Sequence, residues 1–322
     1  MWETDVSSAD LSRATRLLLV RSRREATGLF AGNYTSAFRG GGLEFEESRP
    51  YVPGDDIRSI DWNATARSAE PFVKQFREER NQTLLFLLDV SASMDFGSTG
   101  PTKASTGAHA LALMAAAAGR AGDRVGLVVF DKAVRRQVPI GRGGAHSLRV
   151  IRAALETDGA LRGDTRIGAG LRAVFAATRR RAVVVVISDF RDPEMFPASE
   201  FPASKNSAVG TEFGELARRH DVVAAVVVDP REETLPDAGP IRVMDPERPG
   251  RVLVLNSGSR RVRDRYRAAC SAWRSRIEAD LRRCGADTLW IRTDRDPLFA
   301  LGSFFRNRAA RRSGRLGSGG VR

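Results

Sequence analysis

The sequence predicts an α/β fold, built on a doubly wound, mostly parallel sheet with an antiparallel edge strand and an N-terminal accessory β region. Purely aliphatic strands such as residues 83–89 and 182–188 alternate with helical patterns, which indicates a parallel sheet covered on both faces. The expected strands at residues 124–130 and 133–140 are joined only by Asp131 and Lys132. So short a connection allows only an antiparallel pair, so the second of these strands should lie at an edge of the sheet. A segment rich in Gly, Pro and charge precedes the alternation and supplies the accessory region.

The alternation defines the strands and helices in chain order. The expected strands are residues 83–89, 124–130, 133–140, 182–188, 221–229 and 286–292. The expected helices lie near residues 103–121, 145–156, 167–179, 211–220 and 259–284. The last helix should end at Gly285, and its cysteines, Cys270 and Cys284, lie about 21 Å apart along it, too far for a disulfide. Sheets of this type are commonly ordered 3-2-1-4-5-6, which places ligands beyond the carboxyl ends of the first and fourth strands.

The chain divides into four zones, and no internal repeat is apparent. Residues 1–26 contain one helical pattern, and residues 27–82 form the accessory β region. Residues 83–305 form the α/β domain. Residues 306–322 form a basic tail that we expect to be disordered.

Composition narrows the classes of function. The net charge is +13, but the arginines are spread along the chain and the basic tail has no aromatic side chain for base stacking, so a nucleic-acid partner is not expected. No apolar run approaches the roughly 18 residues that span a bilayer, and the acidic start argues against a secretory signal. We therefore expect a cytoplasmic protein. His109, His146 and His220 form no pair at zinc spacing.

Oxygen-bearing side chains gather where a ligand is expected. Asp89 ends the first strand and is followed by Ser91 and Ser93, Asp189 follows the fourth strand, and Thr165 lies in the loop before a helix. An all-oxygen set suits Mg²⁺, with Mn²⁺ or Ca²⁺ as substitutes, and leaves a coordination position for a carboxylate from another molecule. The simpler alternative is that Ser91 and Ser93 only cap the next helix.

These residues resemble the metal-ion-dependent adhesion site of the von Willebrand factor A domain, through DVSAS, GDTRIGAGL and the SDF that follows the fourth strand. Residues 27–305 also resemble a bacterial family called domain of unknown function 58, in which a signature precedes the A domain. The signature R-x-Y-x-x-G-D-x-x-R-x-I-D-W is matched by Arg49, Tyr51, Gly54, Asp55, Arg58, Ile60, Asp61 and Trp62.

The resemblance implies a binding protein. Relatives are commonly encoded beside MoxR-type AAA+ ATPases and are thought to serve them as adaptors or chaperone-like factors. It therefore implies a protein partner, a MoxR-type ATPase or its client, that offers an acidic side chain to the bound Mg²⁺. The signature itself has two interpretations. It is either structural, with Asp55 or Asp56 capping a turn and Arg58 paired with Asp61 beside a partly buried Trp62, or it forms a partner surface.

The alternative function is a Mg²⁺-dependent phosphotransferase or phosphatase with Asp89 as nucleophile, because aspartyl-phosphate enzymes also carry an Asp after the first strand. Such enzymes typically resemble D-x-D at this point, whereas the second position here is Ser91. Serine-hydrolase and P-loop motifs are not found. We therefore expect no enzymatic activity. The lysines stand in no obvious motif: Lys74, Lys103, Lys132 and Lys205.

Overall fold

A computed structural model gives the structure of the chain. It describes residues 29–38, 43–68, 70–78, 82–156, 163–192, 194–195, 212–244, 246, 250 and 252–317. The helix predicted within residues 1–26 lies outside the described residues.

The central sheet has the predicted order, with the first strand in its middle. Along the sheet the strands run β10-β7-β6-β3-β4-β5, which is the 3-2-1-4-5-6 arrangement. Their bounds are β3 Thr83–Asp89, β4 Arg124–Phe130, β5 Val134–Arg142, β6 Val183–Ser188, β7 Asp221–Val228 and β10 Asp287–Arg292. All neighbours pair in parallel except β4 and β5, so the antiparallel edge strand is also confirmed.

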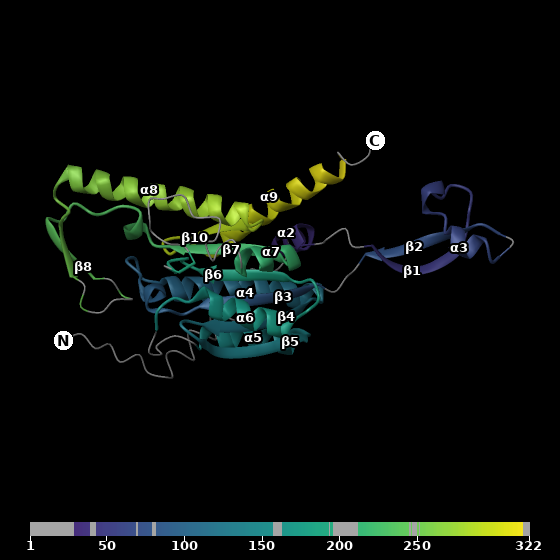
Figure 1. The fold of residues 1–322 in the computed structure, drawn as a ribbon, viewed down its shortest axis with the longest axis horizontal. Helices are drawn as coiled ribbons and strands as arrows, with labels where there is room; N and C mark the ends of the chain where they lie inside the picture. The colour runs from purple at the N-terminus through teal and green to yellow at the C-terminus, as the bar shows by residue number, and fades with distance from the viewer. Residues whose placement is uncertain are drawn as a thin grey trace.

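Helices cover both faces of this sheet (Figure 1). One face is covered by α2 (Leu29–Phe38), α4 (Lys103–Ala121), α5 (Gly144–Leu155) and α9 (Pro297–Gly317). The other face is covered by α6 (Ile167–Ala177), α7 (Gly214–Arg219) and α8 (Arg260–Arg283). As predicted, α8 ends next to Gly285, whose φ of 85° is the left-handed conformation that glycine adopts most easily.

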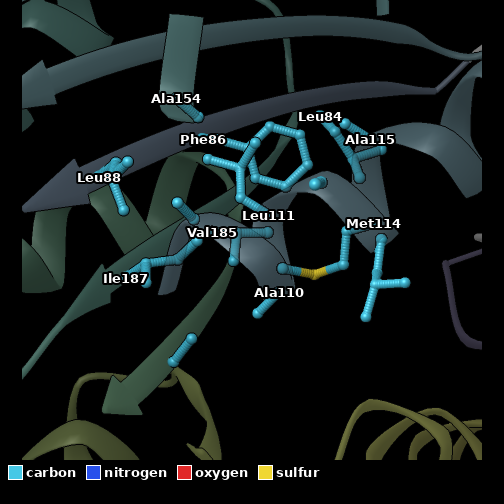
Figure 2. Packing of buried hydrophobic residues seen from close by; sticks show 14 of the residues in the cluster. Leu84, Phe86, Leu88, Ala110, Leu111, Met114, Ala115, Ala154, Val185 and Ile187 are labelled. Carbon is cyan, nitrogen blue, oxygen red and sulfur yellow. The ribbon is translucent and has the colours of Figure 1, made fainter. Parts of the chain in front are cut away.

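Side chains of β3 alternate between the two layers. Leu84, Phe86 and Leu88 pack against α4 on one face, as Figure 2 shows, while Leu85 and Leu87 belong to the cluster on the other face. All are buried. Burial on both faces explains why the strands appear in the sequence as unbroken aliphatic runs.

Small residues allow α4 to lie close to the sheet. A Cβ added at Gly107 would come within 2.8 Å of the Ile187 side chain, so the helix could not approach as closely with a larger residue there. Thr102 caps the start of α4 by accepting a hydrogen bond from the Ser105 amide. The first turn of α4 is therefore fixed at the carboxyl end of β3.

The accessory region is smaller than predicted, because α2 at its start packs on α4 and α9 within the α/β domain. The remainder consists of β1 (Leu43–Pro50), η1 (Ile57–Ser59), α3 (Trp62–Thr65) and β2 (Phe72–Glu78). The strands β1 and β2 pair antiparallel, and Figure 1 shows this unit standing away from the central sheet.

The signature residues have a clear structural role within this unit. Arg49 and Asp55 form an ion pair of 2.7 Å, and Asp55 also accepts from the Val52 amide, which closes the turn as predicted. Asp61 caps α3 and accepts from Ser48 at 2.7 Å. The prediction for Trp62 was wrong, because its side chain is 71% exposed rather than partly buried. This ring therefore remains available on the surface.

Two further elements were not predicted. A separate antiparallel ribbon is formed by β8 (Pro240–Met244) and β9 (Val252–Asn256). The helix α9 continues through Gly317, so the prediction that the tail is disordered from residue 306 was wrong for residues 306–317. Although the segment is rich in arginine, Arg308 is buried and pairs with Asp221 and Asp287. Those ion pairs dock a basic helix that composition alone presents as a solvated tail.

No helix among the residues described here is both long enough and apolar enough to cross a membrane.

Replacing Arg308 with methionine should destabilise the fold by roughly 2 to 3 kcal/mol, since Asp221 and Asp287 would lose their buried counter-charge. Urea unfolding of Arg308→Met measures this loss. The matched control is Arg311→Met, because the exposed Arg311 reaches Asp287 only at 3.4 Å and should contribute less than about 0.5 kcal/mol. Equal, small losses in the two variants would show that α9 is not docked through Arg308.

Candidate metal centre

The parallel pairing of β3 and β6 brings two distant carboxylates to one edge of the sheet. Leu88 is in register with Ile187, so both strands end at the same level. Asp89 is the last residue of β3, and Asp189 follows the last residue of β6. Both side chains are buried. The two acids that the sequence predicts to converge do lie at the same edge, and the charge of Asp189 acts directly on Asp89.

Three hydroxyl groups form a compact cluster beside these acids. The Thr165 hydroxyl donates to Ser91 Oγ at 2.8 Å, and Ser91 Oγ lies 3.2 Å from Ser93 Oγ. Ser93 Oγ is in turn 3.4 Å from Thr165 Oγ1. Ser91 N-caps the short helix η2 (Ala92–Asp95), but its side chain makes no capping hydrogen bond. The alternative in which Ser91 serves only as a cap is therefore not supported by the structure.

Asp89 is held by neutral donors. Its Oδ1 accepts from the Ser91 amide at 2.8 Å, and its Oδ2 accepts from the Ser188 hydroxyl at 2.6 Å. Burial, and then the charge of Asp189, raise the pKa of Asp89 from 3.8 to about 7. The hydrogen bonds from Ser188 and Ser91 act in the opposite direction but do not outweigh burial. In the absence of a cation, Asp89 is the carboxylate on which a proton is most stable.

Asp189 is held by a cation. Its Oδ2 accepts from the Lys103 ammonium at 2.7 Å, and its Oδ1 accepts from the Arg191 amide at 3.1 Å. Burial opposes ionisation, but the Lys103 charge more than compensates and lowers the pKa of Asp189. Phe190 turns the chain sharply after Asp189, with a φ of 55° that is unusual for a bulky residue. A strained backbone of this kind is typical of functional sites.

Lys103 is the site residue that sequence reasoning dismissed. It is the first residue of α4, its side chain is only 1% exposed, and its ammonium also donates to Glu232 Oε1 at 2.7 Å. Glu232 belongs to η4 (Pro230–Glu232), which follows β7 at the same edge. One signal was present in the sequence: α4 begins soon after β3 ends, so its first turn must lie over the carboxyl edge.

Ser188 and Asp229 were also missed. Ser188 is the last residue of β6 and bonds Asp89, as described above. Asp229 follows β7, is buried, and accepts from Ser98 and Thr293. Asp229 thereby ties the loop after β3 to the loop after β7. Polar residues placed directly after buried strands are the sequence signal that could have identified both.

The donor set fits the ion that the sequence predicts. Two carboxylates and three hydroxyls form an all-oxygen group of the kind that suits Mg²⁺. Within the described part of the chain, no cluster of three or more His, Cys, Asp or Glu side chains could hold a metal, so a cation here would depend on the hydroxyls as well. Phe96, 42% exposed, and the exposed Asp95 and Asp164 flank the donors in sequence. The buried donors thus adjoin surface residues.

The fold and this edge define a doubly wound α/β protein with an acidic, hydroxyl-rich site at the carboxyl end of its sheet. The chain belongs to the family described as "Protein of unknown function DUF58", whose family model matches residues 47–276. Two uncharacterized mycobacterial proteins, Mb1516 of Mycobacterium bovis and Rv1480 of Mycobacterium tuberculosis, are each 32% identical to it over 319 residues. Each alignment covers 98% of this chain and 94% of the relative.

Solved structures show more distant likeness. The conserved hypothetical protein BatB from Bacteroides thetaiotaomicron is 16% identical, with a TM-score of 0.42, and the match covers 71% of this chain and 99% of BatB. The SpRpn10 VWA domain is 12% identical, with a TM-score of 0.36, and the match covers 68% of this chain and 93% of that domain. Likeness at this level transfers no function.

The raised pKa of Asp89 makes the stability of the metal-free protein depend on pH. Between pH 3.8 and about 7 the folded state keeps a proton that the unfolded chain has released, so stability falls as the pH rises through this window. Asp89→Asn removes this dependence. In EDTA, the stability of Asp89→Asn relative to wild type should therefore increase from pH 4 to pH 7, by more than about 1 kcal/mol.

Urea unfolding of both proteins across that pH range measures the difference. A difference that stays constant with pH would show that Asp89 is ionised throughout and that its burial is compensated in another way.

Proposed function

We propose that this protein is a metal-dependent protein-binding module. Mg²⁺, or Mn²⁺ or Ca²⁺ in its place, would be held by Asp89, Ser91, Ser93, Thr165 and Asp189. When bound, the ion supplies a positive charge and an open coordination position that an acidic side chain of another protein can occupy. The partner that family resemblance favours is a MoxR-type AAA+ ATPase or its client in the bacterial cytoplasm, with this chain as an adaptor or chaperone-like factor.

One observation carries the proposal: five oxygen-bearing side chains from three separate segments meet at the carboxyl edge of the sheet. Three of them form the hydroxyl cluster with separations of 2.8 to 3.4 Å. The other two are carboxylates buried next to each other; Asp189 pairs with Lys103, whereas Asp89 is held by neutral donors. Buried acids with perturbed pKa values cluster at functional sites, which favours a binding role.

An exposed apolar surface supports a protein partner rather than a small ligand. The β8–β9 ribbon presents Met244 at 72% exposure and Leu253 at 57%, with Val252 and Val254 also exposed. Its base is joined to α8, where Arg263 donates to the carbonyls of Ser257 and Gly258 at 2.7 and 3.0 Å. Exposed apolar side chains gathered on one ribbon favour a protein interaction site.

The enzymatic alternative gains one observation from the structure. Phosphotransferase chemistry at Asp89 needs a nearby cation, and Lys103 is buried in contact with the second carboxylate, Asp189. However, Lys103 pairs with Asp189 and Glu232 rather than with Asp89. We therefore favour binding over catalysis.

Mg²⁺ should stabilise the wild-type protein against unfolding, because a ligand that binds only the folded state adds RT ln(1 + [L]/Kd), about 2.7 kcal/mol at 100 times Kd. Thermal unfolding with MgCl2 or EDTA measures the effect. Asp89→Ala should show little shift, whereas Asp164→Asn, an exposed acid beside Thr165, should respond as wild type does. Equal shifts in wild type and Asp89→Ala would remove the site.

The partner and enzyme proposals have separate tests. A purified MoxR-type ATPase from the same bacterium should bind wild type in Mg²⁺ but not in EDTA, and should bind Asp89→Ala weakly in either. Incubation with Mg²⁺ and acetyl phosphate or a generic phosphatase substrate should yield no turnover that depends on Asp89. Turnover lost in Asp89→Ala would instead establish the phosphotransferase alternative.

A further inference from the structure

Lys103 is a buried cation whose ammonium is paired with two carboxylates. Its ammonium lies 2.7 Å from Asp189 Oδ2 and 2.7 Å from Glu232 Oε1. Lysines are almost never fully buried unless they are paired, because removing the charge from water is costly. Burial favours loss of the proton, but the two carboxylates outweigh it and raise the pKa of Lys103. An ammonium paired with two carboxylates places a positive charge at this edge.

The backbone and its neighbours keep this ammonium in place. The Lys103 amide donates to the Phe96 carbonyl at 2.8 Å, and Thr102 caps the first turn of α4. Glu232 is held in turn, because its Oε2 accepts from the Asp229 amide at 3.1 Å. The ammonium cannot move away from the site without breaking two ion pairs, so it acts as a fixed component of the site.

This ammonium compensates only one of the two acids. Asp189 receives the Lys103 charge, whereas Asp89 accepts from neutral groups, the Ser91 amide and the Ser91 and Ser188 hydroxyls. Any divalent cation bound by both carboxylates would therefore lie near an existing positive charge. At an effective dielectric constant of about 20, two such charges a few ångströms apart repel by an amount that corresponds to more than about tenfold in affinity.

We infer that Lys103 is a built-in counter-ion that keeps the candidate site weak for divalent cations. The inference rests on the proposed function and concerns the regulation of that same site. Asp89, Asp189 and Glu232 carry three negative charges when all are ionised, and Lys103 cancels one of them. A carboxylate from an acidic partner restores the missing negative charge. Metal and partner therefore bind cooperatively, and neither binds tightly alone.

The experiment measures metal affinity directly in the full chain. Isothermal titration with MgCl2, and Mn²⁺ binding followed by electron paramagnetic resonance, give the dissociation constants of wild type, Lys103→Met, Lys103→Gln and Lys103→Arg. The neutral variants should bind at least about tenfold more tightly than wild type, and Lys103→Arg should bind as wild type does. Adding Asp89→Ala to Lys103→Gln should abolish the gain.

Other outcomes separate the two proposals. If wild type and the neutral variants bind metal equally, each in a manner that depends on Asp89, the inference about Lys103 is wrong and the proposed function stands. If no variant binds metal at all, the metal-dependent function fails and the inference fails with it. If the neutral variants do not fold, the Glu232→Gln variant tests the inference instead. It removes one of the two carboxylates that neutralise Lys103, so that the Lys103 charge is paired with Asp189 alone. It should bind metal severalfold more weakly than wild type, and unchanged or tighter binding would overturn the inference.

Discussion

Two carboxylates buried side by side are the constraint on which the polar edge of this protein depends. Asp89 and Asp189 reach that edge because β3 and β6 are parallel neighbours, and neither can move without disturbing the sheet. Because both carboxylates are buried, where charges interact more strongly than in water, the negative charge of each must be balanced by hydrogen bonds or a cation. Ser188 and the Ser91 amide bond the first, and Lys103 pairs with the second. The first residue of α4, η4 and the loop after β6 all contribute contacts to this group.

The α/β scaffold is stable enough to carry these buried polar groups. Its strands are buried on both faces, and helices cover them in two layers, so the ends of the strands are rigid platforms. Loops at the carboxyl ends can then carry polar residues and a strained backbone, as at Phe190, without loss of the core. The polar residues at this edge are thus separate from the apolar core, which is formed by the aliphatic strands and the helices that cover them.

The fold was largely predictable because its strands are buried on both faces. Runs such as residues 182–188 have no polar alternation, and the short connection at Asp131 and Lys132 defines the antiparallel edge. The meeting of Asp89 with Asp189 followed from strand order alone. Lys103 was missed because a lysine at the start of a helix is usually solvated, and its ion pairs with Asp189 and Glu232 become visible only in the structure.

Predictions from composition were wrong where a charged residue is buried or an apolar residue is exposed. The segment from residue 306 is rich in arginine, yet Arg308 is buried against Asp221 and Asp287. The β8–β9 ribbon is the opposite case. Apolar residues such as Leu253 are exposed on it, so their hydrophobicity does not indicate burial in a core. Both departures involve contacts or surfaces that only the three-dimensional arrangement defines.

The contact between α2 and α9 joins the first described helix to the last one. Tyr34 and Phe38 pack against Phe305, with ring centroids 5.8 and 5.3 Å apart, and Arg308 donates to the Ala37 carbonyl across 271 positions of the chain. At a synthesis rate of roughly 5 to 20 residues per second, α9 leaves the ribosome about 15 to 50 s after α2. During that interval the aromatic side chains of α2 have no native partner in α9. This layer of the core therefore closes only after α9 has been synthesised, and the nascent chain must avoid misassembly until then.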